Sequence, residues 1–286
     1  MKSILFLSGK GGTGKTSLAG AFSVLATEKV LADCDVDAAN LHLLLAPRIV
    51  HEGIYQGAKL AIKDEQMCTG CGRCREVCRF HAVSPDFQID SYLCEGCGAC
   101  VTACPVDAID LEIQDTGRWY TAESRLGPLA SAELLPGEET SGKLVAQVKQ
   151  KAAELCQEAA AEWLLIDGSP GIGCPVIASA SGVDVVVLVT EPTLSGLHDL
   201  RRVVGVVQHF GIPAYLVINK EDLNHTVAEQ IETYAAEEKI SVLGGIPYDP
   251  SVTAAMVAGR SAVEQEGSPA GEAMREIFAR LMEQIG

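Results

Sequence analysis

The sequence predicts an α/β fold, in which a mostly parallel sheet carries helices on both faces and is interrupted by a small α+β insert. Continuously apolar runs such as Val185–Val189 alternate with segments whose apolar residues recur at helical spacing. This alternation is typical of parallel sheets that are covered on both faces. The insert is predicted by a third observation, because eight of the 11 cysteines lie between Cys68 and Cys104.

The first part of the main domain is expected over residues 1–58. Its first strand leads into a glycine-rich loop and a helix, and its second strand ends in three acidic residues, Asp33, Asp35 and Asp37. The expected elements are a strand over 4–8, a helix over 15–26, a strand over 30–32 and a helical or turn-like segment over 41–45.

Residues 117–286 are expected to complete the main domain. Alternation over 119–135, broken at Gly127 and Pro128, predicts a β-hairpin. Ser141 is a favourable N-cap for a helix that continues to Ala160. The remaining expected elements are strands over 163–167, 183–190, 214–219 and 240–244, and helices over 194–210, 226–238 and 271–285.

Charge and hydropathy exclude several functional classes. The net charge of −16 over 286 residues argues against nucleic acid as a partner, since phosphate binding needs clustered Lys and Arg. No apolar run approaches the roughly 20 residues of a spanning helix, and the N-terminus lacks the flanks of a signal peptide. The last helix has one apolar face but no basic polar face, so core packing is expected for it. We predict a cytoplasmic protein that binds neither nucleic acid nor membrane.

The eight clustered cysteines form two near-copies of one spacing, Cys-x2-Cys-x2-Cys-x3-Cys. Thiolates with this spacing bind [4Fe–4S] clusters, three from one loop while the fourth serves the other cluster. Zinc sites use CxxC pairs with a longer spacer, and nothing else in the chain suggests the oxidising compartment in which disulfides form. The predicted ligands are Cys68, Cys71, Cys74 and Cys104 for cluster I, and Cys94, Cys97, Cys100 and Cys78 for cluster II.

The ferredoxin-like insert that would hold these two clusters is expected over residues 59–116. Arg79 stands where a proline usually follows the fourth cysteine, whereas Pro105 keeps that proline in the second copy. We expect this difference to change the turn and leave the ligation intact.

A phosphate-binding loop follows the first strand. Residues 9–16, GKGGTGKT, satisfy GxxxxGK[ST] between a strand and a helix. Backbone N–H groups of such a loop close on phosphate oxygens, and the helix N-terminus adds its dipole. Lys15 is expected to reach the β and γ phosphates, and Thr16 to bind Mg²⁺. The residues expected to bind the nucleotide here are Gly9, Lys10, Gly11, Gly12, Thr13, Gly14, Lys15, Thr16 and Ser17.

Two carboxylates, Asp35 and Asp167, are predicted to be catalytic together with Lys10 and Lys15. Each ends an apolar strand beside the phosphate-binding loop, where parallel sheets place their ligands. Phosphoryl transfer depends mainly on positioning and charge stabilisation. For Asp33 and Asp37 we favour a capping or turn role.

Four motifs, GKGGTGKT, DCDVDAAN, LLIDGSPGIGCP and VINKEDLN, resemble in this order the MinD/Mrp-like branch of P-loop ATPases, whose Walker A motif is deviant and which includes the nitrogenase iron protein. With the two cysteine runs, the chain resembles the subfamily that carries an inserted two-cluster bacterial ferredoxin. The resemblance implies a homodimer with nucleotide at its interface, in which Lys10 reaches the partner's nucleotide. It also implies that Asp35 positions the attacking water, that Asp167 holds Mg²⁺ through water, and that 168–173 forms a switch.

The sequence specifies the nucleotide base and the roles of the three remaining cysteines less sharply. The segment 219–222, NKED, resembles the guanine-reading motif of GTPases, but in MinD-like ATPases the residues that match Asn219 and Pro247 lie near adenine. ATP is favoured and GTP remains open. Cys174 stands where the nitrogenase iron protein has a cluster ligand, so it is either a ligand or a packing residue. Packing is expected for Cys34 and Cys156.

Three functions fit these patterns. The first is an ATPase that assembles or carries a metal–sulfur cluster, the second an ATP-gated electron donor to a redox or metal-cluster partner protein, and the third a positioning ATPase with structural clusters. Because every cluster iron already has a thiolate, the clusters suit electron relay better than cargo. We therefore expect a nucleotide-driven dimer cycle coupled to electron transfer in metal-sulfur cluster maturation or a similar reaction.

Overall fold

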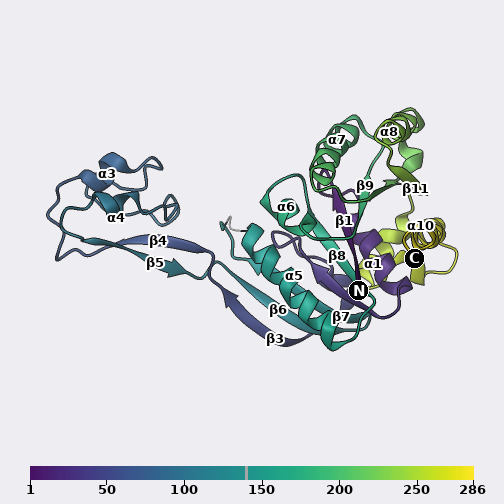
Figure 1. Ribbon diagram of the computed structural model, residues 1–286, viewed down its shortest axis with the longest axis horizontal. Coiled ribbons are helices and arrows are strands. Elements are labelled where there is room, and N and C mark those ends of the chain that lie inside the picture. Colours follow the sequence, from purple (N-terminus) through teal and green to yellow (C-terminus); the bar gives the residue numbers. More distant parts are fainter. Residues whose placement is uncertain (139–140) are drawn as a thin grey trace. The chain divides into compact units, whose positions relative to one another are not determined.

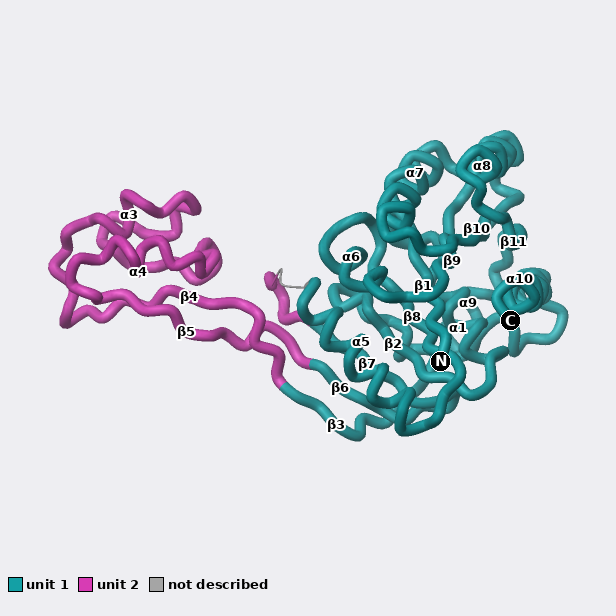
Figure 2. Tube along the Cα trace, viewed as in Figure 1, with its two compact units in different colours: residues 1–53, 119–133, 141–286 teal, residues 54–118, 134–140 magenta. Residues whose placement is uncertain are grey.

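The computed structural model describes residues 1–138 and 141–286, without the side chain of Ser141. The chain forms two compact units (Figure 2). Unit 1 contains Met1–Gly53, Trp119–Glu133 and Ser141–Gly286, and unit 2 contains Ile54–Arg118 and Leu134–Thr140. The insert expected over 59–116 falls within the first segment of unit 2.

A nine-stranded sheet runs through the main domain in the order β11-β10-β9-β1-β8-β2-β7-β6-β3 (Figure 1). Parallel pairs join β1 to β8 and β9, β10 to β9 and β11, and β2 to β7 and β8. The predicted α/β class with a mostly parallel sheet is therefore confirmed. The strands are β1 (Lys2–Ser8), β2 (Lys29–Asp33), β3 (Arg48–Tyr55), β6 (Gly117–Ser124), β7 (Gly127–Leu134), β8 (Trp163–Pro170), β9 (Val185–Thr190), β10 (Ala214–Asn219) and β11 (Ser241–Ile246).

Helices cover both faces of this sheet (Figure 1). On one face α1 (Lys15–Leu25) packs beside α10 (Pro269–Ile285), and on the other α5 (Ser141–Glu158) packs beside α6 (Cys174–Ala180). The remaining helices are α2 (His42–Leu45), α7 (Leu194–His209), α8 (His225–Glu237) and α9 (Pro250–Val257), with 3-10 turns at Glu221–Leu223 and Ala262–Glu264.

Aromatic rings pack the sheet against the two helices α1 and α10 on one of its faces. Phe22 of α1 makes edge-to-face contacts with Phe6 of β1 and Phe278 of α10, at centroid distances of 5.0 and 5.1 Å. Met274, Ile277 and Leu281 of α10 are buried. The apolar face of the last helix therefore packs into the core, as predicted. Among residues 1–138 and 141–286, no helix combines the length and apolarity needed to cross a bilayer.

Among the strands and α-helices of the main domain, three were not expected, namely β3, α6 and α9, and some boundaries differ. The side chains of β3 are mostly exposed, so its sequence shows no alternation, while α6 and α9 have only seven and eight residues, too few for a helical period. The hairpin turns between Ser124 and Gly127, earlier than expected, and the last strand extends to Ile246. The N-cap prediction for Ser141 concerns a side chain outside the described part.

Unit 2 is built on a two-stranded antiparallel ladder of β4 (Ala58–Lys63) and β5 (Ile109–Gln114), in which Lys63 pairs with Ile109. Between these strands lie two short helices, α3 (Arg73–Val77) and α4 (Ala99–Ala103). Each follows a left-handed glycine, Gly72 at φ 79° or Gly98 at φ 76°. The two cysteine runs thus adopt the same local turn, which only glycine adopts without strain.

Candidate functional site

The phosphate-binding loop connects β1, in the middle of the sheet, to α1. Gly14, the N-cap of α1, has φ 91°, and a Cβ there would stand 2.2 Å from Asn219 Nδ2. At Gly11 and Gly12, by contrast, a Cβ would meet no described atom within 4 Å. The buried Thr13 hydroxyl also has no hydrogen-bond partner among the described residues. The loop therefore presents open space and an unsatisfied donor, which suits bound phosphate.

Lys15 and Thr16 both point at Asp167, a fully buried residue of β8. Lys15 Nζ donates to Asp167 Oδ1 at 2.6 Å, and Thr16 Oγ1 donates to Oδ2 at 2.6 Å. Burial alone would lower the pKa of Lys15, but Asp167 and Asp35 more than offset burial and raise this pKa. The lysine is a fixed cation beside a hydroxyl–carboxylate pair, a donor set that suits a phosphate with Mg²⁺.

Asp35 is the second carboxylate at this end of the sheet. It lies after β2, 3.7 Å from Lys15 Nζ, and only 8% of the residue is exposed. Burial raises its pKa to about 6, with Asp167 adding repulsion and Lys15 opposing the shift. Asp35 is therefore poised near neutral pH and lies beside the same lysine as Asp167.

Asp33 has a different role from Asp35. Its Oδ1 accepts from the Asp35 N–H at 3.2 Å and its Oδ2 from the Leu41 N–H at 3.0 Å. Burial and the facing Asp167, its register partner, raise its pKa to about 8. These contacts are those of a turn residue that fixes the segment after β2. Asp37 is exposed.

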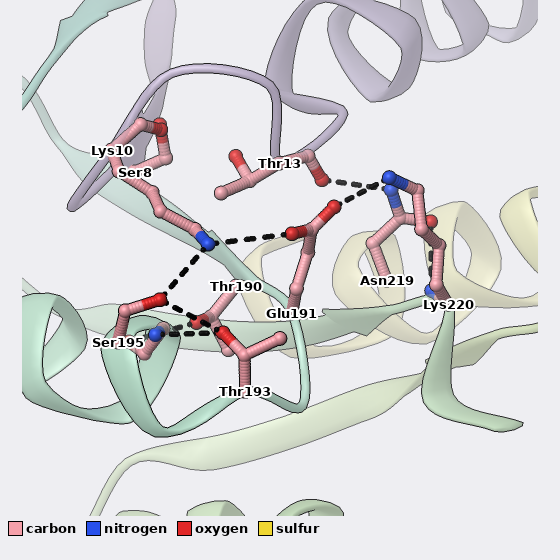
Figure 3. Close-up of polar contacts among 10 residues, drawn as sticks. Ser8, Lys10, Thr13, Thr190, Glu191, Thr193, Ser195, Asn219 and Lys220 are labelled. Atoms are coloured by element: carbon pink, nitrogen blue, oxygen red, sulfur yellow. Dashed lines mark hydrogen bonds and ion pairs between the residues drawn. The ribbon is translucent and has the colours of Figure 1, made fainter. Parts of the chain in front are cut away.

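The loop after β10 lies against the phosphate-binding loop (Figure 3). Asn219 Nδ2 donates to the Thr13 carbonyl at 2.7 Å. Asp222 Oδ1 accepts from the Tyr248 N–H at 2.7 Å, which fixes the segment that contains the half-buried Pro247. The two residues expected near the base, Asn219 and Pro247, therefore belong to loops that one hydrogen bond joins.

A carboxylate that the sequence analysis did not select, Glu191, lies beside Lys10 (Figure 3). Its Oε2 is 3.6 Å from Lys10 Nζ, and its Oε1 accepts from Lys220 Nζ at 2.5 Å. Lys10 Nζ also donates to Ser195 Oγ at 3.2 Å. In the single chain Lys10 thus contacts its own β9–α7 loop. One feature of the sequence could have identified Glu191: like Asp35, it follows an apolar strand.

The eight clustered cysteines line two separate hollows of unit 2. The hollows contain about 340 and 360 Å³ of space and are alike in size as well as in lining. The cysteines of the first hollow are Cys68, Cys71, Cys74 and Cys104, and those of the second are Cys78, Cys94, Cys97 and Cys100. Each hollow thus combines three cysteines of one run with the last cysteine of the other.

These hollows do not form a site for a single metal ion. Over residues 1–138 and 141–286, no three His, Cys, Asp or Glu side chains converge closely enough to hold one. A four-iron cluster is a larger body, with one thiolate on each iron at its corners, so four separated thiols around a hollow fit it in number and chemistry. Burial raises the pKa of Cys74 and Cys100. The deprotonated thiolate form of these two residues is therefore disfavoured unless a positive partner stabilises it.

The other three cysteines lie in unit 1. Cys34 and Cys156 are buried, and burial raises the pKa of both, that of Cys156 to about 11. They are inert packing residues. Cys174 is exposed at the start of α6, and a Cβ on Gly142 would stand 3.1 Å from its Cβ.

Comparison with known proteins identifies the family. The family model described as "CobQ/CobB/MinD/ParA nucleotide binding domain" matches residues 4–262. An uncharacterised protein of Methanocaldococcus jannaschii is 33% identical over 99% of this chain and 97% of its own length. The septum site-determining protein MinD of Bacillus subtilis is 24% identical over 98% of this chain and 89% of its own.

A solved structure shows the same fold. The septum site-determining protein MinD of Pyrococcus horikoshii, complexed with Mg-ADP, superposes with a TM-score of 0.62 at 17% identity and covers 100% of this chain and 97% of its own. This likeness shows a shared fold, and the family model adds that the fold is a nucleotide-binding domain. The chain belongs to the CobQ/CobB/MinD/ParA family of P-loop nucleotide-binding domains.

Proposed function

We propose that the protein is an ATPase that couples a nucleotide-driven dimer cycle to electron transfer through two [4Fe–4S] clusters in unit 2. The observation that carries the ATPase part is the convergence of Lys15, Thr16, Asp35 and Asp167 at one end of the sheet. The observation that carries the cluster part is the sorting of eight cysteines into two four-cysteine hollows.

The nucleotide site would hold Mg-ATP with its phosphates against Gly11 and Gly12, where the loop is open. Lys15 would bind the β and γ phosphates, and Thr16 with Asp167 would hold Mg²⁺, directly or through water. Asp35, buried beside Lys15, would orient the attacking water. Hydrolysis here is positioning and charge stabilisation, for which buried and fixed groups are suited.

ATP is favoured over GTP by the contacts of the NKED loop. The carboxylate of Asp222, which would pair with guanine in a GTPase, instead accepts the Tyr248 N–H at 2.7 Å. The amide of Asn219 is held on Thr13. The Asp222 carboxylate is therefore engaged by the backbone of the segment after β11, and it is not available to pair with guanine.

In unit 2 the first hollow would hold cluster I on Cys68, Cys71, Cys74 and Cys104, and the second would hold cluster II on Cys78, Cys94, Cys97 and Cys100. Such clusters supply one-electron redox chemistry at low potential. The protein supplies the thiols and the left-handed turns at Gly72 and Gly98. All ligands are permanent parts of the chain, which favours electron relay over cluster donation.

Metal analysis and spectroscopy of the anaerobically purified protein test this proposal. We expect about eight iron atoms per chain, and about half that number in each of the matched variants Cys74→Ser and Cys100→Ser. We also expect ATP hydrolysis that Lys15→Ala abolishes, and a reduced-cluster EPR signal that changes when ATP is added. A protein that binds no iron, or a signal insensitive to ATP, would contradict the redox role.

A second candidate is a MinD/ParA-like positioning ATPase in which the clusters are structural. The comparisons support it more directly than the redox role, because MinD proteins are among the relatives. It predicts ATP hydrolysis and nucleotide-dependent association with normal iron content, but no exchange of electrons. Equal hydrolysis rates with oxidised and reduced clusters, together with no ATP effect on the EPR signal, would favour this candidate.

A further inference from the structure

Glu191 connects two loops of the nucleotide site. Its carboxylate lies between Lys10 of the phosphate-binding loop and Lys220 of the loop after β10 (Figure 3). Only 12% of the Glu191 side chain is exposed, against 31% of each lysine side chain. The carboxylate is therefore a largely buried anion whose described neighbours include two cations, and both come from segments expected to contact nucleotide.

The two contacts differ in strength. The 2.5 Å contact with Lys220 is a charge-assisted hydrogen bond, whereas the 3.6 Å contact with Lys10 is an ion pair beyond hydrogen-bond distance. The Lys220 backbone is fixed as well, since its N–H donates to Asn219 Oδ1 at 3.0 Å. Lys220 thus anchors Glu191, and Lys10 is the partner that Glu191 can release.

We propose that Glu191 is a positioning residue that holds Lys10 on its own chain until nucleotide phosphate replaces the carboxylate. This inference rests on the proposed function, because it requires Lys10 to act on a nucleotide. A nucleoside di- or triphosphate carries more negative charge than one carboxylate and attracts the lysine more strongly. The hydroxyl of Ser195, 3.2 Å from Lys10 Nζ, completes the holding site.

The competition makes a thermodynamic prediction. Nucleotide binding must break the ion pair between Lys10 and Glu191, which makes the net free energy of binding less favourable. Removing the Glu191 charge should therefore tighten nucleotide binding, and only when Lys10 is present. Because 31% of the Lys10 side chain is exposed, solvent partly screens this ion pair, and its removal corresponds to a gain of roughly two- to fivefold in affinity.

The alternative explanation is plain charge repulsion, since losing any carboxylate near phosphate tightens binding. Asp199 provides the matched control. Its backbone carbonyl carbon lies 2.5 Å from where a Cβ on Gly9 would stand, but its carboxylate contacts His198 at 3.1 Å. Asp199→Asn therefore removes a charge beside the loop and leaves the Lys10–Glu191 pair intact.

The test is a double-mutant cycle with a fluorescent non-hydrolysable ATP analogue and Mg²⁺, measured by titration on the full chain, because Lys10 is expected to reach the nucleotide in the ATP-bound dimer. We expect Glu191→Gln to lower the dissociation constant roughly two- to fivefold in the native background, and with Lys10→Ala to have no more than the small effect of Asp199→Asn. Asp199→Asn should have the same small effect in both backgrounds. Ser195→Ala, which loosens Lys10 from the other side, should give a smaller gain that Lys10→Ala also abolishes.

Two results would overturn the inference: no tightening by Glu191→Gln, or an equal tightening with and without Lys10. Thermal unfolding of each variant shows whether it is folded, and Ser195→Ala carries the test alone if Glu191→Gln is not. A native protein that binds no nucleotide would refute the proposed function and this inference together. Normal binding without the Lys10-dependent gain would refute this inference only.

Discussion

At the scale of single residues, the buried carboxyl group of Asp35 makes the stability of the nucleotide-free protein depend on pH. Burial raises its pKa to about 6, so the fold favours the protonated carboxyl, while the unfolded chain titrates near its ordinary value of about 3.9. The contribution to stability is complete below pH 4 and is lost as the pH rises through 6. Above pH 7 the nucleotide-free protein therefore holds an unfavourable charge.

Asp35→Asn should remove this charge. We expect the variant without nucleotide to be more stable than the native chain at pH 8, on the order of 1–2 kcal/mol after allowing for solvent screening. The gain should be smaller at pH 5, where the native Asp35 is mostly protonated. Urea unfolding at the two pH values measures this difference, and Glu158→Gln at the exposed end of α5 is the control. A gain that does not change with pH would contradict the explanation.

The grouping of residues was predictable from sequence where a motif constrains the spacing. Spacing alone sorted eight cysteines into two sets of four, and the two hollows contain those same sets; whether clusters fill them stays a prediction. Glu191 belongs to none of the motifs that directed the sequence analysis. Its importance comes from two lysines, 181 and 29 positions away in the chain, which only the folded sheet brings together.

At the scale of elements, the C-terminal helices depend on one shared cap. Asp249 Oδ1 accepts from the Ser251 N–H at the start of α9, and its Oδ2 accepts from the Ser268 hydroxyl and the Ala270 N–H at the start of α10. Although partial burial alone would raise the pKa of Asp249, these hydrogen bonds lower it to about 2. One carboxylate thus satisfies donors at two helix N-termini.

Asp249→Ala should destabilise the protein by about 1–2 kcal/mol at pH 7, the usual cost of a lost cap. Because the folded pKa is depressed, this stability is present above the unfolded value of about 3.9 and is lost as the pH falls toward 2. The native and variant unfolding midpoints should therefore converge below about pH 4. Chemical denaturation over a pH series checks this, and an undiminished difference at pH 3 would exclude the carboxylate as the cause.

Elements were predictable where burial imposes a pattern. The central strands β1 and β9 are almost entirely buried and read as continuous apolar runs. The edge strand β3 carries the exposed side chains Ile49, Val50 and Ile54, which leave no alternation to detect. The helix α6 is short, and its one signal is a proline in its first turn, Pro175.

At the scale of the whole molecule, each unit has its own core. Unit 1 packs around residues such as Phe6 and Phe22, and unit 2 around Ala61, Cys74, Val83 and Ile109. A separate unit around the cysteines was expected because composition changes abruptly at the borders of that region, and its assignment as a ferredoxin domain stays a prediction. The assignment of 134–140 to unit 2 was not predictable, since that segment follows the hairpin in sequence and joins unit 2 through the bond from the Leu135 N–H to the Thr116 carbonyl.

The pairing of Lys63 with Ile109 allows the cysteine region to be removed cleanly. Replacing residues 64–108 by Asn-Gly would close β4 and β5 with a two-residue turn suited to such a pair. We expect the shortened chain to keep the unfolding temperature of unit 1 and its affinity for ADP, and to bind no iron. Calorimetry, nucleotide titration and metal analysis test this. Loss of nucleotide binding in a folded product would show that the two functions depend on each other more than the separate cores suggest.

The division of unit 1 into three chain segments also sets an order of events during synthesis. All residues of unit 2 have left the ribosome once residue 140 has emerged, whereas the sheet of unit 1 lacks β8 and β9 until residue 190 has emerged. Since domains fold as their chain becomes available, unit 2 should reach its final shape while the nucleotide site is still incomplete. Under the proposed function, the nascent protein would then be able to receive iron before it is able to bind ATP.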